Sequence, residues 1–397
     1  MDITAMIVLV IVLALFFDFT NGFHDTANAM ATPIATGAIT PRKAVALAAV
    51  LNLVGAFLST EVAKTISGGL IREGEQGIHI TPEVIFAGLM GAVMWNMFTW
   101  LRGLPSSSSH ALFGGLIGAA VVGMGLHAVN FETLVAKVIL PAVAAPIIAG
   151  FAAWLTTRMA YALTARRDAE GSKLRQGRGT FRVGQVFTSS LVALSHGTND
   201  AQKTMGIITL VLIAGGEQQV GTGPQLWVIA ACAAAIAVGT YAGGWRIIRT
   251  LGTGLTEVRP AQGFSAESST AAAILASSHL GFALSTTQVA SGSVIGSGLG
   301  RRGTSVRWGT AGRIALGWVL TLPAAALVGG LAALLIALGT PGVLVTAILG
   351  TIAVVWMFVV SQRQKVAHHN VVEVEEAGEA VAFTRRKRRR FTSRGTA

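Results

Sequence analysis

Residues 20–30 read TNGFHDTANAM, and residues 195–206 read SHGTNDAQKTMG. The first stretch follows directly on the apolar run Ile3 to Phe17, and the second resembles it closely, with Asp200 in the place of Asp25. An ionisable side chain beside hydrocarbon costs a few kcal/mol on insertion scales, so such residues usually mark a pathway or a binding site. Two copies of the cluster therefore predict a duplicated functional site.

The composition indicates a membrane protein with many spans. The chain has 397 residues, 52% hydrophobic and 12% charged, and its mean hydropathy of +0.63 is too high for an ordinary soluble domain. Ile3 to Phe17 has no basic residue before it and no cleavage pattern after it, so we interpret it as a retained span and not a secretory signal. Runs long enough to cross a hydrocarbon layer of about 30 Å are Val84 to Leu101, Leu134 to Leu155, Leu226 to Ile248, Ile314 to Leu338 and Val343 to Val360.

The net charge of +12 is concentrated in two places that flank apolar runs. Residues 158–182 contain seven basic and two acidic residues, and residues 363–397 contain nine basic and four acidic ones. This distribution is typical of cytoplasmic segments of membrane proteins, so we expect a lipid bilayer partner and no nucleic acid. The hexamer RRKRRR at residues 385–390 is also able to attract anionic lipid or RNA. The single cysteine, Cys232, excludes a disulfide framework within the chain.

A second pair of motifs supports an internal repeat. Residues 104–119, LPSSSSHALFGGLIGA, resemble residues 283–298, ALSTTQVASGSVIGSG, and each follows its acidic motif in the same order. Two motifs that recur in one order indicate duplicated halves, a common construction of secondary transporters. Because both are polar and rich in glycine, we expect re-entrant hairpins that line the same cavity as the acids.

The predicted fold is therefore all-α and polytopic, with two inverted repeats, about ten to twelve transmembrane helices and two re-entrant helical hairpins. Inversion is an expectation from the transporter class. We divide the chain into a first repeat, a basic cytoplasmic linker, a second repeat and a charged, disordered tail. Their ranges are 1–165 with a hairpin near 104–126, 166–182, 183–362 with a hairpin near 271–299, and 363–397.

The chemistry of these motifs fits an anion that travels with a cation. On a helix Asn21, Asp25 and Asn28 share one face, as do His196, Asp200 and Lys203. Hydroxyl runs at the starts of the second hairpin helices would combine hydroxyl donors with free backbone N–H groups, which makes an anion site without arginine. The acids with amide oxygens are hard ligands for Na⁺, a proton or a divalent metal.

These residues resemble a family. GFHDTANA and HGTNDAQK are similar to the two signature motifs of the inorganic phosphate transporter (PiT) family, bacterial low-affinity type, and LPSSSSH with STTQ is similar to its paired hairpin tips. The resemblance runs in order from about residue 16 to residue 300 and implies a phosphate symporter of the plasma (inner) membrane. It implies cation or proton coupling by Asp25 and Asp200, and phosphate binding by Ser107, Ser108, Ser109, Ser285, Thr286, Thr287, Asn28 and Asn199. We also assign His24 and Lys203 to coupling, from their own chemistry, because the sequence departs from the family at these two positions.

The coupling ion is a separate question. His24 stands where the family often has asparagine, and Lys203 stands where the first motif has Asn28. Imidazole titrates near neutral pH, and a fixed ammonium leaves room for fewer mobile cations. We therefore expect no organic cofactor and proton-coupled import of phosphate, or of a neutral metal-phosphate. Sodium coupling is the alternative, in which Asp25 and Asp200 would ligate sodium or a co-bound divalent metal.

Other functions remain open at this stage. Sulfate is the rival oxyanion, although a carboxylate acceptor favours protonated phosphate. An intramembrane hydrolase would use a serine and a histidine, but Ser195 and His196 are adjacent and point about 100° apart on a helix. A passive anion channel would use basic rings, whereas the charges here are mostly acidic. Four further polar residues lie in or beside apolar runs, and each could equally mediate helix–helix contacts or line a cation pathway: Asp18, Glu61, Asn52 and Asn96. The sequence is also compatible with a homodimer.

Overall fold

The computed structural model describes residues 2–69, 79–169, 174–282, 284–363 and 366–371. Within these ranges the regular secondary structure is helical, apart from one isolated bridge between Thr256 and Val306. The predicted all-α class is confirmed. The first half contains α1 Ile3–Ala35, α2 Pro41–Gly55, α3 Glu61–Gly69, α4 Pro82–Leu101, α5 Ser108–Met124, the 3₁₀ turn Leu126–Ala128, α6 Phe131–Leu134, the π turn Val135–Ile139 and α7 Leu140–Ala169.

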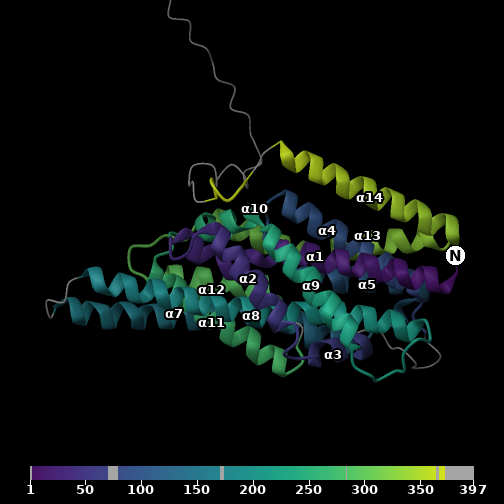
Figure 1. The fold of residues 1–397 in the computed structure, drawn as a ribbon, viewed down its shortest axis with the longest axis horizontal. Coiled ribbons are helices and arrows are strands. Elements are labelled where there is room, and N and C mark those ends of the chain that lie inside the picture. Colours follow the sequence, from purple (N-terminus) through teal and green to yellow (C-terminus); the bar gives the residue numbers. More distant parts are fainter. Residues whose placement is uncertain (1, 70–78, 170–173, 283, 364–365, 372–397) are drawn as a thin grey trace, which may run out of the picture.

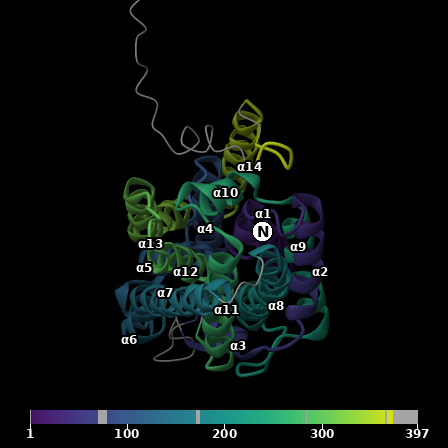
Figure 2. The ribbon, with the colours of Figure 1, turned by 90° about the vertical axis from the view of Figure 1, so that its left-hand side faces the viewer.

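The second half begins with the second motif helix, α8. It contains α8 Leu174–Ala214, α9 Leu226–Ala242, α10 Trp245–Arg249, the π turn Thr250–Gly254, α11 Pro260–His279, α12 Thr286–Gly300, α13 Trp308–Ile336 and α14 Thr340–Gln362. Most helices run roughly along the long axis of the molecule, with α14 along one edge (Figure 1). Turned by 90°, the same helices form a bundle around α1 and α8 (Figure 2).

The helices fit a membrane environment. Five of the described helices are long and apolar enough to cross a bilayer, and a sixth span results if Leu226–Ala242 and Trp245–Gly254, bent by 60°, are taken together. The outer faces of α13 and α14 expose large apolar side chains, including Leu327, Leu331, Ile348 and Ile352. The chain is therefore a multi-pass membrane protein. The remaining helices are shorter or more polar, so the expected total of ten to twelve spans stays a prediction.

Reciprocal packing joins the two halves. The motif helix α1 packs against α9 of the second half, and the motif helix α8 packs against α2 of the first. A Cβ on Gly22 would lie 2.3 Å from the Ile236 carbonyl oxygen, and one on Gly197 would lie 2.2 Å from the Asn52 carbonyl oxygen. The equivalent glycines thus permit equivalent close contacts, as expected for a duplicated fold. The inversion of the repeats stays a prediction.

Both hydroxyl runs lie at helical turns, as the sequence predicts. The first turn joins α4 to α5, and the second joins α11 to α12. The hairpins are longer than expected, because the apolar run Val84 to Leu101 forms an arm of the first hairpin and residues 260–270 begin an arm of the second. Sequence reasoning assigned the first of these runs to an independent span because its length and apolarity suit either role.

The expected linker and tail are only partly described. Residues 166–169 end α7 and residues 174–182 begin α8, since this basic stretch contains many good helix formers; residues 170–173 lie outside the described ranges. The first part of the tail packs on the protein: Val371 is buried, and Arg249 Nη2 donates to the Asn370 carbonyl at 2.7 Å. Residues 372–397 lie outside the described part. The cytoplasmic location of both segments stays a prediction.

Candidate functional site

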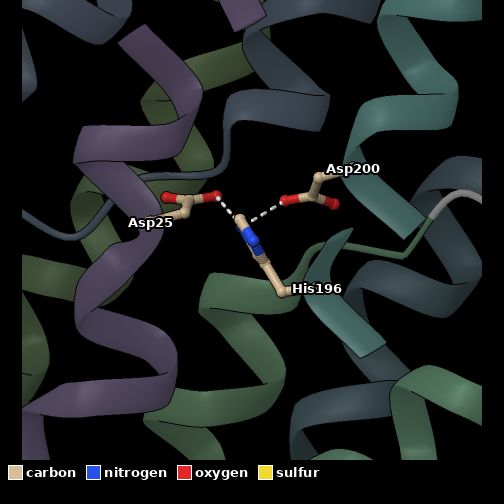
Figure 3. A group of neighbouring side chains, drawn as sticks. All are labelled: Asp25, His196 and Asp200. Carbon is tan, nitrogen blue, oxygen red and sulfur yellow. Dashed lines mark ion pairs between the residues drawn. The ribbon is translucent and has the colours of Figure 1, made fainter. Parts of the chain in front are cut away.

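The two acidic motifs meet at the centre of the molecule. His196 of α8 lies between the carboxylates of Asp25 and Asp200 (Figure 3), with its Nε2 atom 2.9 Å from Asp200 Oδ2 and 3.8 Å from Asp25 Oδ2. His196 and Asp200 share one helix face because they are four residues apart. Asp25 comes from α1, so the site needs both halves of the chain.

Each acid has a further basic partner. His24 Nδ1 lies 2.6 Å from Asp25 Oδ1, and the Lys203 ammonium pairs with Asp200. Lys203 Nζ also donates to Ser109 Oγ at 2.6 Å and to the Leu284 carbonyl at 3.0 Å. Two carboxylates are thus offset by one lysine and, when protonated, two histidines. An anion that enters this site does not face uncompensated negative charge.

The hairpin tips supply helix N-termini, as the sequence predicts. Ser107 caps α5 and accepts from the His110 backbone N–H at 3.1 Å. Ser285 caps α12 in the same way and accepts from the Gln288 backbone N–H at 3.3 Å. The positive ends of two helix dipoles therefore lie beside the acids, an arrangement that favours anions.

The tip hydroxyls contact the motif acids directly. Ser108 Oγ donates to Asp25 Oδ2 at 3.1 Å, and Thr287 Oγ1 donates to Asp25 Oδ1 at 3.1 Å. Thr286 Oγ1 donates to Asp200 Oδ2 at 3.1 Å. The site thus brings together two acids and both hairpins, as predicted from their shared order in the sequence.

The amides of the two motifs are placed differently. Asn28 Nδ2 donates to Thr287 Oγ1 at 3.0 Å and to Thr286 Oγ1 at 3.3 Å, so this amide lies at the second hairpin tip. Asn199 Nδ2 instead donates to Ser278 Oγ at 3.0 Å and to the Phe282 carbonyl at 3.4 Å, at the end of α11. Asn28 therefore joins the hydroxyl cluster, whereas Asn199 anchors the hairpin arm beside it.

All twelve residues predicted for the site are buried. The most exposed is Asn28 at 7%, and the others are Ser107, Ser108, Ser109, Ser285, Thr286, Thr287, Asn199, Asp25, Asp200, His24 and Lys203. Buried polar groups need partners, and here the two hairpins and the two motif helices provide them for each other. The arrangement is an occluded site, closed on all sides by protein.

Sequence reasoning did not name every member. His196 was placed on the polar face of α8 but not among the site residues, and it has the central position. Thr99 and Ser106 were also missed: their hydroxyls lie 2.7 Å apart, and each is 3.4 Å from His24 Nε2. The i, i+4 spacing to Asp200 was a usable signal for His196. No sequence spacing relates Thr99 to His24.

The cluster also has the donor atoms of a metal site. Asp25, His196 and Asp200 each offer a ligand atom, and these atoms all lie within 4.8 Å of one another. Mixed carboxylate and imidazole ligands suit divalent transition metals better than sodium, which prefers oxygen. The predicted pair Asp25 and Asp200 therefore acquires a nitrogen ligand that the sequence expectation did not include.

Comparisons with known proteins agree with this architecture. The structure is similar to a solved structure described as "The sodium-dependent phosphate transporter", with a TM-score of 0.74, 23% identity and coverage of 84% of this chain and all of that one. At this identity the likeness establishes the fold alone.

Sequence relatives are much closer. A protein of Mycobacterium leprae named "Probable low-affinity inorganic phosphate transporter" is 51% identical over 93% of this chain and 87% of its own length. A protein of Bacillus subtilis with the same name is 41% identical over 84% of this chain and 98% of its own length. Residues 21–329 match the description "Phosphate transporter family". The chain therefore belongs to the phosphate transporter family, as the motifs predict.

Proposed function

We propose that this protein imports inorganic phosphate across the plasma membrane by symport with protons. The observation that carries the proposal is the shared buried site, where hydroxyls of both hairpin tips and two helix N-termini surround Asp25 and Asp200. Family membership supports a transporter and argues against an enzyme. The Ser195 hydroxyl donates to the Leu191 carbonyl at 2.6 Å, which also disfavours its use as a nucleophile.

The donor set favours phosphate over sulfate. Ser108, Thr286 and Thr287 supply neutral donors, which suit an anion that must leave again. Asp25 and Asp200 supply acceptors, and a protonated phosphate can donate to a carboxylate. Sulfate carries no proton at neutral pH and would meet only repulsion from them. The hydroxyls and helix N-termini would thus bind the oxyanion, and the acids would select its protonated forms.

The basic partners of the acids support proton coupling. Lys203 forms an ion pair with Asp200, and His24 contacts the Asp25 carboxylate. Side chains of the protein therefore stand where mobile cations would otherwise bind. Because the solved structure named as sodium-dependent shares only 23% identity, its sodium dependence does not transfer to this chain.

Uptake of ³²P-phosphate into proteoliposomes tests the proposal. An imposed pH gradient without sodium is expected to drive accumulation by the wild type. Asp25→Asn and Asp200→Asn should each abolish it, and Glu132→Gln, which changes an exposed acid of α6, should leave it unaltered. If accumulation required a sodium gradient and did not respond to the pH gradient, the coupling ion would be sodium and not the proton. Uptake of ³⁵S-sulfate but not of phosphate would refute the proposal that phosphate is the substrate.

The three ligand atoms of Asp25, His196 and Asp200 suggest a second possible substrate, a metal-phosphate complex. A divalent metal held there would travel with phosphate as a neutral complex. Double-label uptake with ⁵⁷Co²⁺ and ³²P-phosphate would then show both labels accumulating in equal amounts. Uptake of phosphate at an unchanged rate in the presence of a chelator would contradict this form and leave phosphate symport in place.

A further inference from the structure

A second buried acid lies apart from the central site. Asp18 is on α1, seven residues before Asp25, which places it about 10 Å away along the helix axis. Its side chain is fully buried. Among the described residues, neither carboxyl oxygen of Asp18 has a hydrogen-bond partner.

The surroundings of Asp18 are polar but contain no paired cation. The hydroxyl of Thr204 on α8 faces its carboxyl and also lacks a hydrogen bond within the described part of the chain. The titratable groups that act on Asp18 are His196, Asp200 and Lys203 of α8 and Cys232 of α9. None of them forms a described ion pair with it, because His196 and Lys203 pair with Asp200.

The other buried acids of the described residues differ in this respect. Asp25 and Asp200 have histidine or lysine partners. Glu267 of α11 accepts from the hydroxyls of Thr32 and Thr188 and from the Gln185 amide. Asp18 alone among the four has no basic partner, and the donor that faces it is the Thr204 hydroxyl.

Electrostatics then decides the state of this carboxyl. An isolated ionised carboxylate in a low-dielectric interior is so costly that the group normally takes up a proton instead. A neutral carboxyl needs no counter-ion. We propose that Asp18 is the proton-carrying site of the transport cycle, distinct from the phosphate site, an inference that rests on the proposed proton symport.

The position of Asp18 explains how the two sites would be coupled. Lys203 and His196 act electrostatically on Asp18, and Lys203 also contacts the hairpin tips through Ser109 and the Leu284 carbonyl. Phosphate bound at the tips adds negative charge beside these two groups, which favours the protonated form of Asp18. By linkage, a proton on Asp18 favours phosphate binding by the same factor. Loading of either ligand thus promotes loading of the other.

The test compares two activities of one variant in proteoliposomes. Asp18→Asn mimics the neutral carboxyl and cannot release a proton. It is expected to keep phosphate/phosphate counterflow within twofold of the wild type, while accumulation driven by a pH gradient falls at least tenfold. Asp18→Glu keeps a titratable group and should retain both activities, and Glu132→Gln should behave as the wild type.

The outcomes separate the inference from the proposed function. Gradient-driven accumulation by Asp18→Asn at the wild-type level would overturn the inference, because another group would carry the proton. Loss of counterflow in both Asp18→Asn and Asp18→Glu would also overturn it, because Asp18 would then be structural. A wild type that accumulates phosphate only under a sodium gradient would instead refute the proton symport itself, and the proton role of Asp18 with it.

Discussion

At the scale of single residues, the site is a balance of like and unlike charges in a buried space. Asp25 and Asp200 would repel each other strongly, since charges a few ångströms apart interact far more in protein than in water. His196 lies between them and Lys203 holds the second acid. Removing either base therefore leaves the buried negative charge less well compensated, which costs more than a surface substitution.

Substitution of His196 tests its central position. His196→Gln is expected to reduce phosphate uptake more than tenfold, because the neutral amide no longer offsets both carboxylates. The adjacent Ser195→Ala is the control, since the Ser195 hydroxyl contacts only its own helix backbone among the described contacts. Uptake rates in proteoliposomes, normalised to reconstituted protein, distinguish the two. Uptake at the wild-type rate by His196→Gln would show that His196 is not needed at the site.

The buried lysine is expected to matter for stability as well. Lys203→Met breaks a buried ion pair with Asp200 and should cost about 3–5 kcal/mol. Lys64→Met breaks the half-exposed pair with Glu61, at 2.8 Å, and should cost about 1 kcal/mol or less. Apparent melting temperatures in detergent measure the contrast. Similar shifts for the two variants would argue against a buried, desolvated pair at Asp200.

Much of this residue-level site was predictable, and the reason is the duplication. Aligning Asp25 with Asp200 and Ser107–Ser109 with Ser285–Thr287 identified the acids and the hydroxyls that the structure brings together. His196 could have been predicted from its i, i+4 spacing to Asp200. Thr99 could not, because its contact with His24 joins two helices and no spacing within one motif encodes it.

At the scale of helices, each hairpin rests on the half to which it does not belong. Helix α5 packs on α13, and α12 packs on α7. A Cβ on Gly118 would lie 1.9 Å from the Ala326 carbonyl oxygen, and one on Gly296 would lie 1.9 Å from the Gly150 carbonyl oxygen. The sequence predicted glycine-rich hairpins but not this exchange, because a glycine pattern shows that backbones approach closely without showing which helix approaches.

The close packing of each hairpin on the opposite half predicts that adding a single methyl group at a contact glycine lowers the stability of the protein. Gly118→Ala and Gly296→Ala should each destabilise the protein by about 1–3 kcal/mol, because a backbone must move to admit the methyl group. Gly312→Ala in α13 has no atom within 4 Å of the new Cβ and should be neutral or slightly stabilising. Thermal unfolding of the three variants checks this. A neutral Gly296→Ala beside a destabilising Gly312→Ala would contradict the packing.

At the scale of the whole molecule, the described site lies where the two halves of the chain meet. Every predicted site residue is buried, so the described arrangement is closed, and transport requires at least one further arrangement in which the site opens. The hairpin tips are the part that both touches the acids and rests on the opposite half.

The sequence predicted this whole-molecule plan better than its membrane topology. Composition identified the membrane class, and the two motif pairs identified the halves. The number of spans was harder, since α4 is a hairpin arm whose length and apolarity match those of spanning helices. The basic stretch near residues 166–182 was likewise hard to assign, because residues that favour solvent also favour helix.

The central claim is that hydroxyls of both hairpin tips, held against the motif acids, bind the transported phosphate. The most direct measurement is the initial rate of ³²P-phosphate uptake into proteoliposomes by Ser108→Ala and Thr287→Val, with Thr351→Val as control. A hydrogen bond to a charged group contributes about 1.5–3 kcal/mol, so each tip variant should lose roughly tenfold to a hundredfold in rate. The control removes an exposed hydroxyl that bonds only within α14 in the described structure and should transport normally. Tip variants that transport phosphate at the wild-type rate would contradict the account.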